Sequence, residues 1–305
     1  MKKVYVILSA YNGERYLREQ VESILAQTGV EVTLLIRDDG SQDGTPGIMQ
    51  DIQAAHAGVR CVYGENIGFR RSFFDSLLEA DDTYDYYAFA DQDDVWDPDK
   101  LSRAVEMLEQ AEGEVKLYAS GLRVVNENLE FMYNNTFPGL RTDYGAALSR
   151  QRIAGCTMVF DKGLFHRCRR FRITPEMGNL FSHDAAVYYI CLACGGQVIF
   201  DPESRISFRR HTGTVTEHGK GFWTRVESVT NVFGRFRDRR YNQVRELLKV
   251  YADDMPPEVY ELSQKIAGYR GSVGKTLALA ADKRIRCGIR SADIVNWVAV
   301  LCRRY

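Results

Sequence analysis

Residues 86–101 read YYAFADQDDVWDPDKL, an apolar run followed by a cluster of carboxylates. The run at 86–90 has the length and composition of a buried strand, and Pro98 suits the start of a following helix. Three aspartates lie in the turn between them: Asp91, Asp93 and Asp94. Negative charge at the end of a buried strand has two interpretations: a turn that caps the next helix, or a site that holds a cation.

The residues up to 110 alternate between strand-like and helix-like patterns. Apolar, mostly β-branched or aromatic stretches predict strands at 4–9, 32–36, 59–63 and 86–90. Apolar residues at helical spacing predict helices over 14–27, 45–55, 68–80 and 98–110. Strands that alternate with helices are typical of an α/β fold, in which helices cover both faces of a mainly parallel sheet.

Polar residues follow each predicted strand. The four loops begin with Ser9-Ala10-Tyr11-Asn12, Asp38-Asp39-Gly40-Ser41, Glu65-Asn66 and Asp91-Gln92-Asp93-Asp94. Ligands of such sheets bind beyond the carboxyl ends of the strands, so the four loops predict one site. This convergence favours the cation-binding interpretation, because two carboxylates two residues apart suit Mg²⁺ or Mn²⁺ held together with substrate phosphate oxygens.

Beyond residue 112 the pattern is less regular. We expect strands at 115–120, 122–125, 156–160, 197–200 and 206–209, a helix at 184–194 and a long polar connection over 126–152. Residues 221–305 read as helical and hold 16 Lys/Arg against 9 Asp/Glu, a net charge of +7, whereas residues 1–220 carry −8. The sequence therefore predicts an anionic body over 1–220 and a basic helical extension over 221–305.

Length and composition restrict the class of protein. A chain of 305 residues with 45% apolar and 27% charged residues is typical of a globular protein. Seven cysteines, an odd count with no pair of CxxC motifs, favour a reducing compartment. The apolar run at the N-terminus is too short for a secretory signal, and no stretch approaches the ~20 apolar residues of a membrane span. We expect a cytoplasmic protein that is not integral to a membrane.

Two further motifs fail their tests. Asp39-x-Ser41-x-Asp43-Gly44 imitates a calcium loop, but its twelfth position is Gln50, and a strand precedes it where a helix is required. GYRGSVGKT at 268–276 has Tyr269 where a phosphate loop needs glycine, and a helix-like segment precedes it. We exclude both assignments.

Four motifs in order carry a family resemblance. SAYN at 9–12, DDGS at 38–41, ENIG at 65–68 and DQDD at 91–94 followed by Pro98-Asp99 together resemble the family 2 glycosyltransferases, which have the GT-A fold. GCT at 155–157, HD at 183–184 and RRH at 209–211 resemble the acceptor-side motifs of that family. The combination of DQDDVW, GCT and HD is most similar to its bacterial rhamnosyltransferase branch.

The resemblance implies a role for each motif. The implied donor-binding residues are Ala10, Tyr11, Asn12, Asp38, Asp39, Asn66, Asp91 and Gln92, with Asp38 or Asp39 facing the base and Asp91 the ribose side. The implied metal ligands are Asp93, Asp91 and His211, and Asp184 matches the catalytic base. Residues 1–110 would form the nucleotide-binding half of a GT-A-like (Rossmann-like) domain over 1–220, and residues 111–220 the acceptor half.

The implied activity is that of an inverting, metal-dependent glycosyltransferase. It would move a sugar from a nucleoside diphosphate, with dTDP-rhamnose as the candidate donor, to a glycan or lipid-linked acceptor in cell-surface polysaccharide synthesis. The required cofactor would be Mg²⁺ or Mn²⁺. Two alternatives stay open: a nucleotidyltransferase, which also uses paired carboxylates and metal, and a non-catalytic nucleotide- or glycan-binding protein. No nucleic-acid recognition motif is present.

The basic extension has two interpretations of its own. It contains two clusters of basic residues and one apolar segment. The first cluster is Arg235, Arg237, Arg239 and Arg240, and the second is Lys283, Arg284, Arg286 and Arg290. The apolar segment follows the second cluster and contains Ile294, Val295, Trp297, Val298, Val300 and Leu301. A helix with tryptophan and aliphatic residues beside arginines can lie in an anionic membrane surface. It can equally pack on the body with its charges solvated. The first interpretation would place the protein peripherally on the inner face of the membrane.

Overall fold

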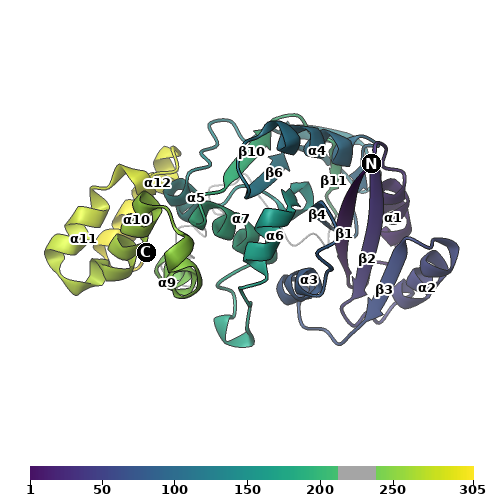
Figure 1. Cartoon of the computed structure of the whole chain (residues 1–305), viewed down its shortest axis with the longest axis horizontal. Coiled ribbons are helices and arrows are strands. Elements are labelled where there is room, and N and C mark those ends of the chain that lie inside the picture. The colour runs from purple at the N-terminus through teal and green to yellow at the C-terminus, as the bar shows by residue number, and fades with distance from the viewer. Residues whose placement is uncertain (212–237) are drawn as a thin grey trace. The chain divides into compact units, whose positions relative to one another are not determined.

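The computed structural model describes residues 1–211 and 238–305, and Figure 1 shows its helices and strands. It has two compact units. The first, the sheet unit, comprises Met1–Phe137, Ile153–Cys191 and Gly196–His211. The second, the helical unit, comprises Pro138–Arg152, Leu192–Gly195 and the described part of Thr212–Tyr305. The predicted basic residues Arg235 and Arg237 lie outside the described residues.

A seven-stranded, mostly parallel sheet forms the core of the sheet unit. Its order is β10-β6-β9-β4-β1-β2-β3. The strands are β1 (Lys2–Ala10), β2 (Val30–Asp38), β3 (Val59–Tyr63), β4 (Tyr86–Ala90), β6 (Lys116–Ser120), β9 (Val159–Asp161) and β10 (Gln197–Asp201). All neighbours pair in parallel except β9, which runs antiparallel to both β4 and β6. The predicted α/β fold is therefore confirmed.

Helices cover both faces of this sheet. Consecutive residues from Val4 to Leu8 are all buried, and so is every residue of β4, as expected of strands with no solvent-facing side. The sheet contacts α1 (Leu17–Leu25), α2 (Thr45–Ala55), α3 (Phe69–Leu78), α4 (Lys100–Gln110) and α6 (Lys162–Cys168). In α4 the buried residues Leu101, Ala104, Val105 and Leu108 repeat at helical spacing, which is why this segment forms an amphipathic helix.

A second, four-stranded sheet lies in the same unit. Its order is β5-β11-β7-β8, with β5 (Val95–Trp96), β7 (Leu122–Val125), β8 (Phe131–Asn135) and β11 (Ile206–Arg209). Strand β5 follows the acidic turn directly and pairs antiparallel with β11 through Trp96 and Ile206. This pairing brings residues near 209 to the acidic turn.

Two sequence expectations need correction. The segment 126–152 is not a connection without secondary structure: it contains β8 and α5 (Tyr144–Ser149), whose cap Asp143 accepts a hydrogen bond from the amide of Ala146. The strand expected at 156–160 begins later, because Gly155–Thr157 forms the 3₁₀ turn η1. The helix expected at 184–194 is α7 (His183–Ala193).

The described part of the helical unit consists of short helices. They are α5, α9 (Arg239–Tyr251), α10 (Pro257–Gly268), α11 (Val273–Ala280) and α12 (Arg290–Leu301), with 3₁₀ turns η3 (Ala252–Asp254), η4 (Tyr269–Gly271) and η5 (Lys283–Ile285). Buried aromatic residues hold this unit together: Tyr144, Tyr251, Tyr269 and Tyr305. Among the described residues, no helix has the length and apolarity needed to cross a bilayer.

Candidate functional site

The carboxyl ends of four parallel strands meet at one edge of the main sheet. Ala10 pairs with Asp38 and Asp38 with Tyr63, while Leu8 pairs with Ala90. The loops that follow β1, β2, β3 and β4 therefore begin beside one another. These are the loops in which the sequence analysis placed the donor-binding residues.

Hydrogen bonds between these loops fix Tyr11, Asn12 and Gln92. The Gln92 side chain accepts from the amide of Tyr11 at 2.9 Å and donates to its carbonyl oxygen at 3.1 Å. Asn12, with a positive φ of 48°, receives the amide of Gln42 on its Oδ1 at 2.8 Å. These hydrogen bonds thus join the β1, β2 and β4 loops, while Tyr11 stays 44% exposed beside Ala10, the buried strand end.

The two aspartates after β2 have different partners. Asp39 is 2% exposed, and its carboxylate accepts from Arg37 at 2.6 Å and from the amides of Ile67 and Gly68 at 2.9 and 3.0 Å. Asp39 therefore ties the β2 loop to the start of α3. Asp38 is 4% exposed, and its carboxylate accepts from the amide of Ser41 at 3.2 Å.

Asn66 belongs to the same group of loops. Its side chain is exposed and accepts a hydrogen bond from the amide of Gly68 at 3.1 Å. A Cβ added at Gly40 would lie 2.8 Å from the amide nitrogen of Asn66, so the β2 and β3 loops touch. Gly40 has a φ of 79°, which adds a second reason for glycine at this position.

His211 and Asp93 converge at the acidic turn. His211 Nε2 lies 2.7 Å from Asp93 Oδ2, and both side chains are 19% exposed. Arg209 stabilises this arrangement, since its Nε donates to the carbonyl oxygen of Asp93 at 2.7 Å and its guanidinium stacks on the ring of Tyr16. The pairing of β11 with β5 is the reason that His211 reaches the turn.

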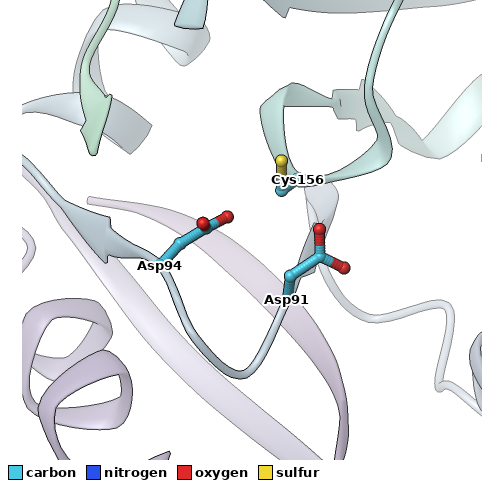
Figure 2. A group of neighbouring side chains, drawn as sticks. All are labelled: Asp91, Asp94 and Cys156. Carbon is cyan, nitrogen blue, oxygen red and sulfur yellow. The ribbon is translucent and has the colours of Figure 1, made fainter. Parts of the chain in front are cut away.

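The side chains of Asp91 and Asp94 extend toward another segment, the one around Cys156. Figure 2 shows both side chains extending toward the segment that carries Cys156, and the ligand atoms of these three residues lie within 4.8 Å of one another. Asp94 is fully buried; its Oδ1 accepts from the amide of Arg209 at 3.0 Å, and its Oδ2 has no hydrogen-bond partner among the described residues. Burial raises the pKa of Asp91 and of Asp94 well above the usual range, and neighbouring carboxylates add to the effect.

A buried lysine accompanies this cluster. Lys100, the first residue of α4, is 1% exposed, and its Nζ lies 3.6 Å from the centroid of the Trp96 ring. Burial lowers the pKa of Lys100 to about 7, whereas Cys156 and Asp94 oppose this shift. Lys100 is therefore a basic residue in an otherwise acidic cluster beneath the turn, and burial favours its neutral amine. The sequence analysis assigned it no role.

The residues His183 and Asp184 stand at the start of α7, against η1. A Cβ at Gly155 would lie 2.7 Å from His183 Nε2 and 3.2 Å from Asp184 Cβ, so only glycine allows this approach. His183 stacks on Phe73 with ring centroids 4.1 Å apart, and burial lowers its pKa to about 4. Asp184 is half-buried and near enough to Asp91 for its charge to raise the pKa of that residue.

The acidic turn fits a divalent cation at its outer side. The carboxylate oxygen of Asp93 and the imidazole nitrogen of His211 are partly exposed potential metal-ligand atoms that lie 2.7 Å apart. Oxygen and imidazole ligands suit Mn²⁺ and, for the carboxylate, Mg²⁺. The inner set of Asp91, Asp94 and Cys156 suits an ion less well, because burial raises the pKa of all three groups and so favours their protonated forms. Asp91 is thus the one predicted metal ligand that the structure turns inward.

Sequence reasoning missed the roles of Arg209, Lys100 and Cys156. Arg209 touches three segments of the unit: it binds the carbonyl oxygens of Asp93 and Glu127, and at the start of α1 it contacts the carboxylate of Glu19 and the ring of Tyr16. No local pattern marks such contacts. The sequence signals were the motifs RRH and GCT, which contain Arg209 and Cys156, and the position of Lys100 next to the last residue of the stretch 86–101.

Three comparisons agree with the geometry. The family model "Glycosyl transferase family 2" matches residues 5–168. The chain is 23% identical over 260 residues to dTDP-rhamnosyl transferase RfbG of Shigella flexneri, covering 81% of this chain and 85% of RfbG. It spans about 65% of the length of several other curated relatives.

Solved structures show the same fold. S. aureus TarS 1-349 in complex with UDP-GlcNAc superposes with a TM-score of 0.57 at 12% identity, covering 99% of this chain and 90% of TarS. The mannosyltransferase PcManGT of Pyrobaculum calidifontis, in complex with GDP-Man and Mn²⁺, gives 0.53 at 17% identity, covering 99% and 88%. At these identities the likeness shows the fold alone, and the expected GT-A-like architecture is confirmed.

Proposed function

The chain belongs to glycosyl transferase family 2, and from that premise we propose that it is a metal-dependent, inverting enzyme that transfers a sugar from a nucleoside diphosphate. One observation carries the proposal. The ligand atoms of Asp91 and Asp94 lie within 4.8 Å of Cys156, and the adjacent Gly155 packs against His183 and Asp184, so the candidate base lies beside the acidic turn that carries the candidate metal ligand Asp93. A leaving diphosphate and an acceptor hydroxyl need two such anionic features, one for each.

Each group then has one task. In the transfer, the bond from the anomeric carbon to the diphosphate oxygen breaks, a bond to the acceptor oxygen forms, and Asp184 takes the acceptor's proton. Asp93 and His211 would hold the divalent ion, which when bound neutralises charge on the diphosphate. Attack from the face opposite the leaving group inverts the anomeric configuration. The α7 start fixes Asp184, whose Oδ1 lies 2.8 Å from the amide of Ala185.

For the donor we propose dTDP-rhamnose. Its support is the similarity to RfbG, which extends over 81% of the chain. The related folds of TarS and PcManGT bind UDP-GlcNAc and GDP-Man, so the fold itself does not select the nucleotide. The hydrogen-bonded loops that carry Tyr11, Asn12 and Gln92 are the surfaces on which we place it, with Asp38 on the side of the base.

The acceptor we propose is a glycan or lipid-linked glycan of a cell-surface polysaccharide. Residues 1–110 would bind the nucleotide, residues 111–220 the acceptor, and residues 221–305 would form the basic extension. In this arrangement the protein works in the cytoplasm, peripherally on the inner face of the membrane.

The testing experiment measures release of nucleoside diphosphate from a panel of nucleotide sugars. With Mn²⁺ and no acceptor, we expect slow hydrolysis of dTDP-rhamnose that stops in excess chelator. Each alternative gives its own signature: a nucleotidyltransferase releases pyrophosphate from dTTP and a sugar phosphate, and a binding protein shows saturable binding without release. Either signature would contradict the proposal.

A further inference from the structure

One side of α12, the last helix, is packed and the other is uncovered. Its buried residues are Asn296, Ala299 and Val300, and Asn296 Nδ2 donates to the carbonyl oxygen of Ser149 at 3.3 Å. Ile294 and Trp297 are 54% and 50% exposed. The contacts that hold α12 in the helical unit are therefore satisfied without these two large apolar side chains.

One face of α12 carries three exposed residues, Arg290, Ile294 and Trp297, and the half-buried Leu301. Arg290, Ile294, Trp297 and Leu301 follow at intervals of four, three and four residues, which places them on one helical face. We call these four residues the outer stripe. The neighbouring helix α11, which contacts α12, leaves Val273 and Leu277 67% and 55% exposed four residues apart. Monomeric proteins seldom leave aliphatic and tryptophan side chains gathered in this way without a partner.

The charges around the outer stripe are unbalanced. Residues 269–305 hold eight Lys/Arg and only two Asp, with no Glu. Arg270 pairs with Asp238, and Arg284 pairs with Asp282 and Glu261. The other six make no ion pair with any residue that the structure describes: Lys275, Lys283, Arg286, Arg290, Arg303 and Arg304. The partner of this surface should therefore be anionic.

We propose that the outer stripe of α12 rests on the surface of an anionic lipid bilayer. A bilayer offers negative headgroups for the cations and acyl chains for Trp297 and Ile294 at adjacent depths. A polynucleotide would leave the apolar side chains in water. A second copy of the chain, joined through the same face, would bring like charges together. The inference rests on the proposed function only for its purpose, which is to bring the enzyme to a lipid-linked acceptor.

Flotation with vesicles tests the proposal on the full chain. We expect co-flotation with vesicles of phosphatidylcholine and phosphatidylglycerol, none with phosphatidylcholine alone, and release by salt. Replacing Arg286 or Arg290 by Gln should lower the partition coefficient about fivefold for each charge, since a cation near such a surface contributes on the order of 1 kcal/mol. In a Trp223→Phe background, the emission of Trp297 should shift to the blue on binding, while buried Trp96 does not respond.

A matched pair of double variants distinguishes binding through the outer stripe from nonspecific hydrophobic binding. Ile294→Ser with Trp297→Ser should abolish flotation. Phe131→Ser with Met132→Ser, which removes side chains that are 61% and 51% exposed on β8, should not. Flotation that survives the first pair, or equal binding to neutral vesicles, would overturn the proposal. So would a concentration-dependent dimer in light scattering that only the first pair disrupts.

The same variants keep the two proposals apart. Nucleoside diphosphate release from a soluble donor should be unchanged in both double variants. None of the four replaced residues belongs to the acidic turn or, in the part of the chain that the structure describes, makes a hydrogen bond to it. If flotation fails while donor hydrolysis persists, the membrane inference and the proposed peripheral location fail, and the proposed reaction stands. If hydrolysis is absent from the wild type while flotation persists, only the proposed reaction fails.

Discussion

The imidazole of His211 lies 2.7 Å from the carboxylate of Asp93, although 118 positions separate the two residues. The short strands β5 and β11 create this contact by pairing Trp96 with Ile206. Arg209 fixes it from the other side by binding the carbonyl oxygen of Asp93. A carboxylate oxygen and an imidazole nitrogen thus converge at the end of a buried parallel strand. The loops that follow β1, β2 and β3 begin at the same edge of the sheet.

Replacing Asp184 by Asn should abolish transfer while leaving the fold intact. The amide cannot take the acceptor's proton, and general-base assistance is typically worth ~10²–10⁴-fold. We expect kcat to fall by that factor with donor binding unchanged. Steady-state transfer assays and nucleoside diphosphate binding by the same variant provide the check, and near-wild-type turnover would remove the base from the mechanism.

Gly155→Ala should reduce transfer through a displaced Asp184. The new Cβ would meet His183 Nε2 at 2.7 Å and Asp184 Cβ at 3.2 Å, so the start of α7 must shift. Gly47→Ala is the control: in α2 a Cβ meets nothing within 4 Å, and the change should raise stability by about 0.5–1 kcal/mol without loss of activity. Equal turnover in both variants would show that α7 is not positioned by this contact.

His183 should make the protein less stable in acid. Its pKa falls from 6.5 to about 4 on folding, so between these values the unfolded chain binds more protons than the native state and stability rises with pH. Acidification from pH 6.5 to 4 should therefore cost the wild type about 3 kcal/mol more than a His183→Phe variant.

Urea unfolding at several pH values measures that difference directly. The subtraction also cancels the opposite contribution of Asp91, whose raised pKa favours the native state as pH falls. Exposed His166, replaced by Gln, is the control and should keep the wild-type pH dependence. Parallel pH profiles for wild type and His183→Phe would contradict the assignment of a buried neutral imidazole.

Lys100 and Asp94 should be energetically coupled. Both are buried beneath the acidic turn, and the charge of Asp94 opposes the lowering of the pKa of Lys100. In a double-mutant cycle, Lys100→Met should cost less stability in an Asp94→Asn background than in the wild type, with a coupling of about 1–3 kcal/mol. Additivity within about 0.5 kcal/mol would mean that the two groups do not interact.

The sequence predicted the elements that depend on local pattern. The first four strands and their helices follow from apolar periodicity, and the positions of the loops follow from the rule for parallel sheets. The placement of β9 between β4 and β6 was beyond reach, because it depends on the pairing of Tyr86 with Asp161 across 75 positions. The helix α5 had a visible signal in its cap Asp143, which was overlooked in a polar stretch.

The candidate site divides in the same way. The motifs predicted Asp91, Asp93, Asp184 and His211 as site residues, but the sequence could not distinguish carboxylates that face outward from those that pair within the fold. Both carboxylate oxygens of Asp39 accept hydrogen bonds within the fold, from Arg37 and from amides at the start of α3. Asp94 is enclosed with Lys100 and Cys156. These environments arise from tertiary packing, which neighbouring residues in the sequence do not reveal.

The central claim is that Asp93 and His211 hold a divalent ion against a nucleoside diphosphate. Thermal unfolding with dTDP, in the presence of Mn²⁺ or of chelator, tests it most directly, because a bound ligand raises the unfolding temperature by mass action. We expect stabilisation that requires Mn²⁺ in the wild type and is lost in both Asp93→Asn and His211→Ala. Equal stabilisation by dTDP in chelator, or Mn²⁺-dependent stabilisation that persists in both variants, would contradict the account.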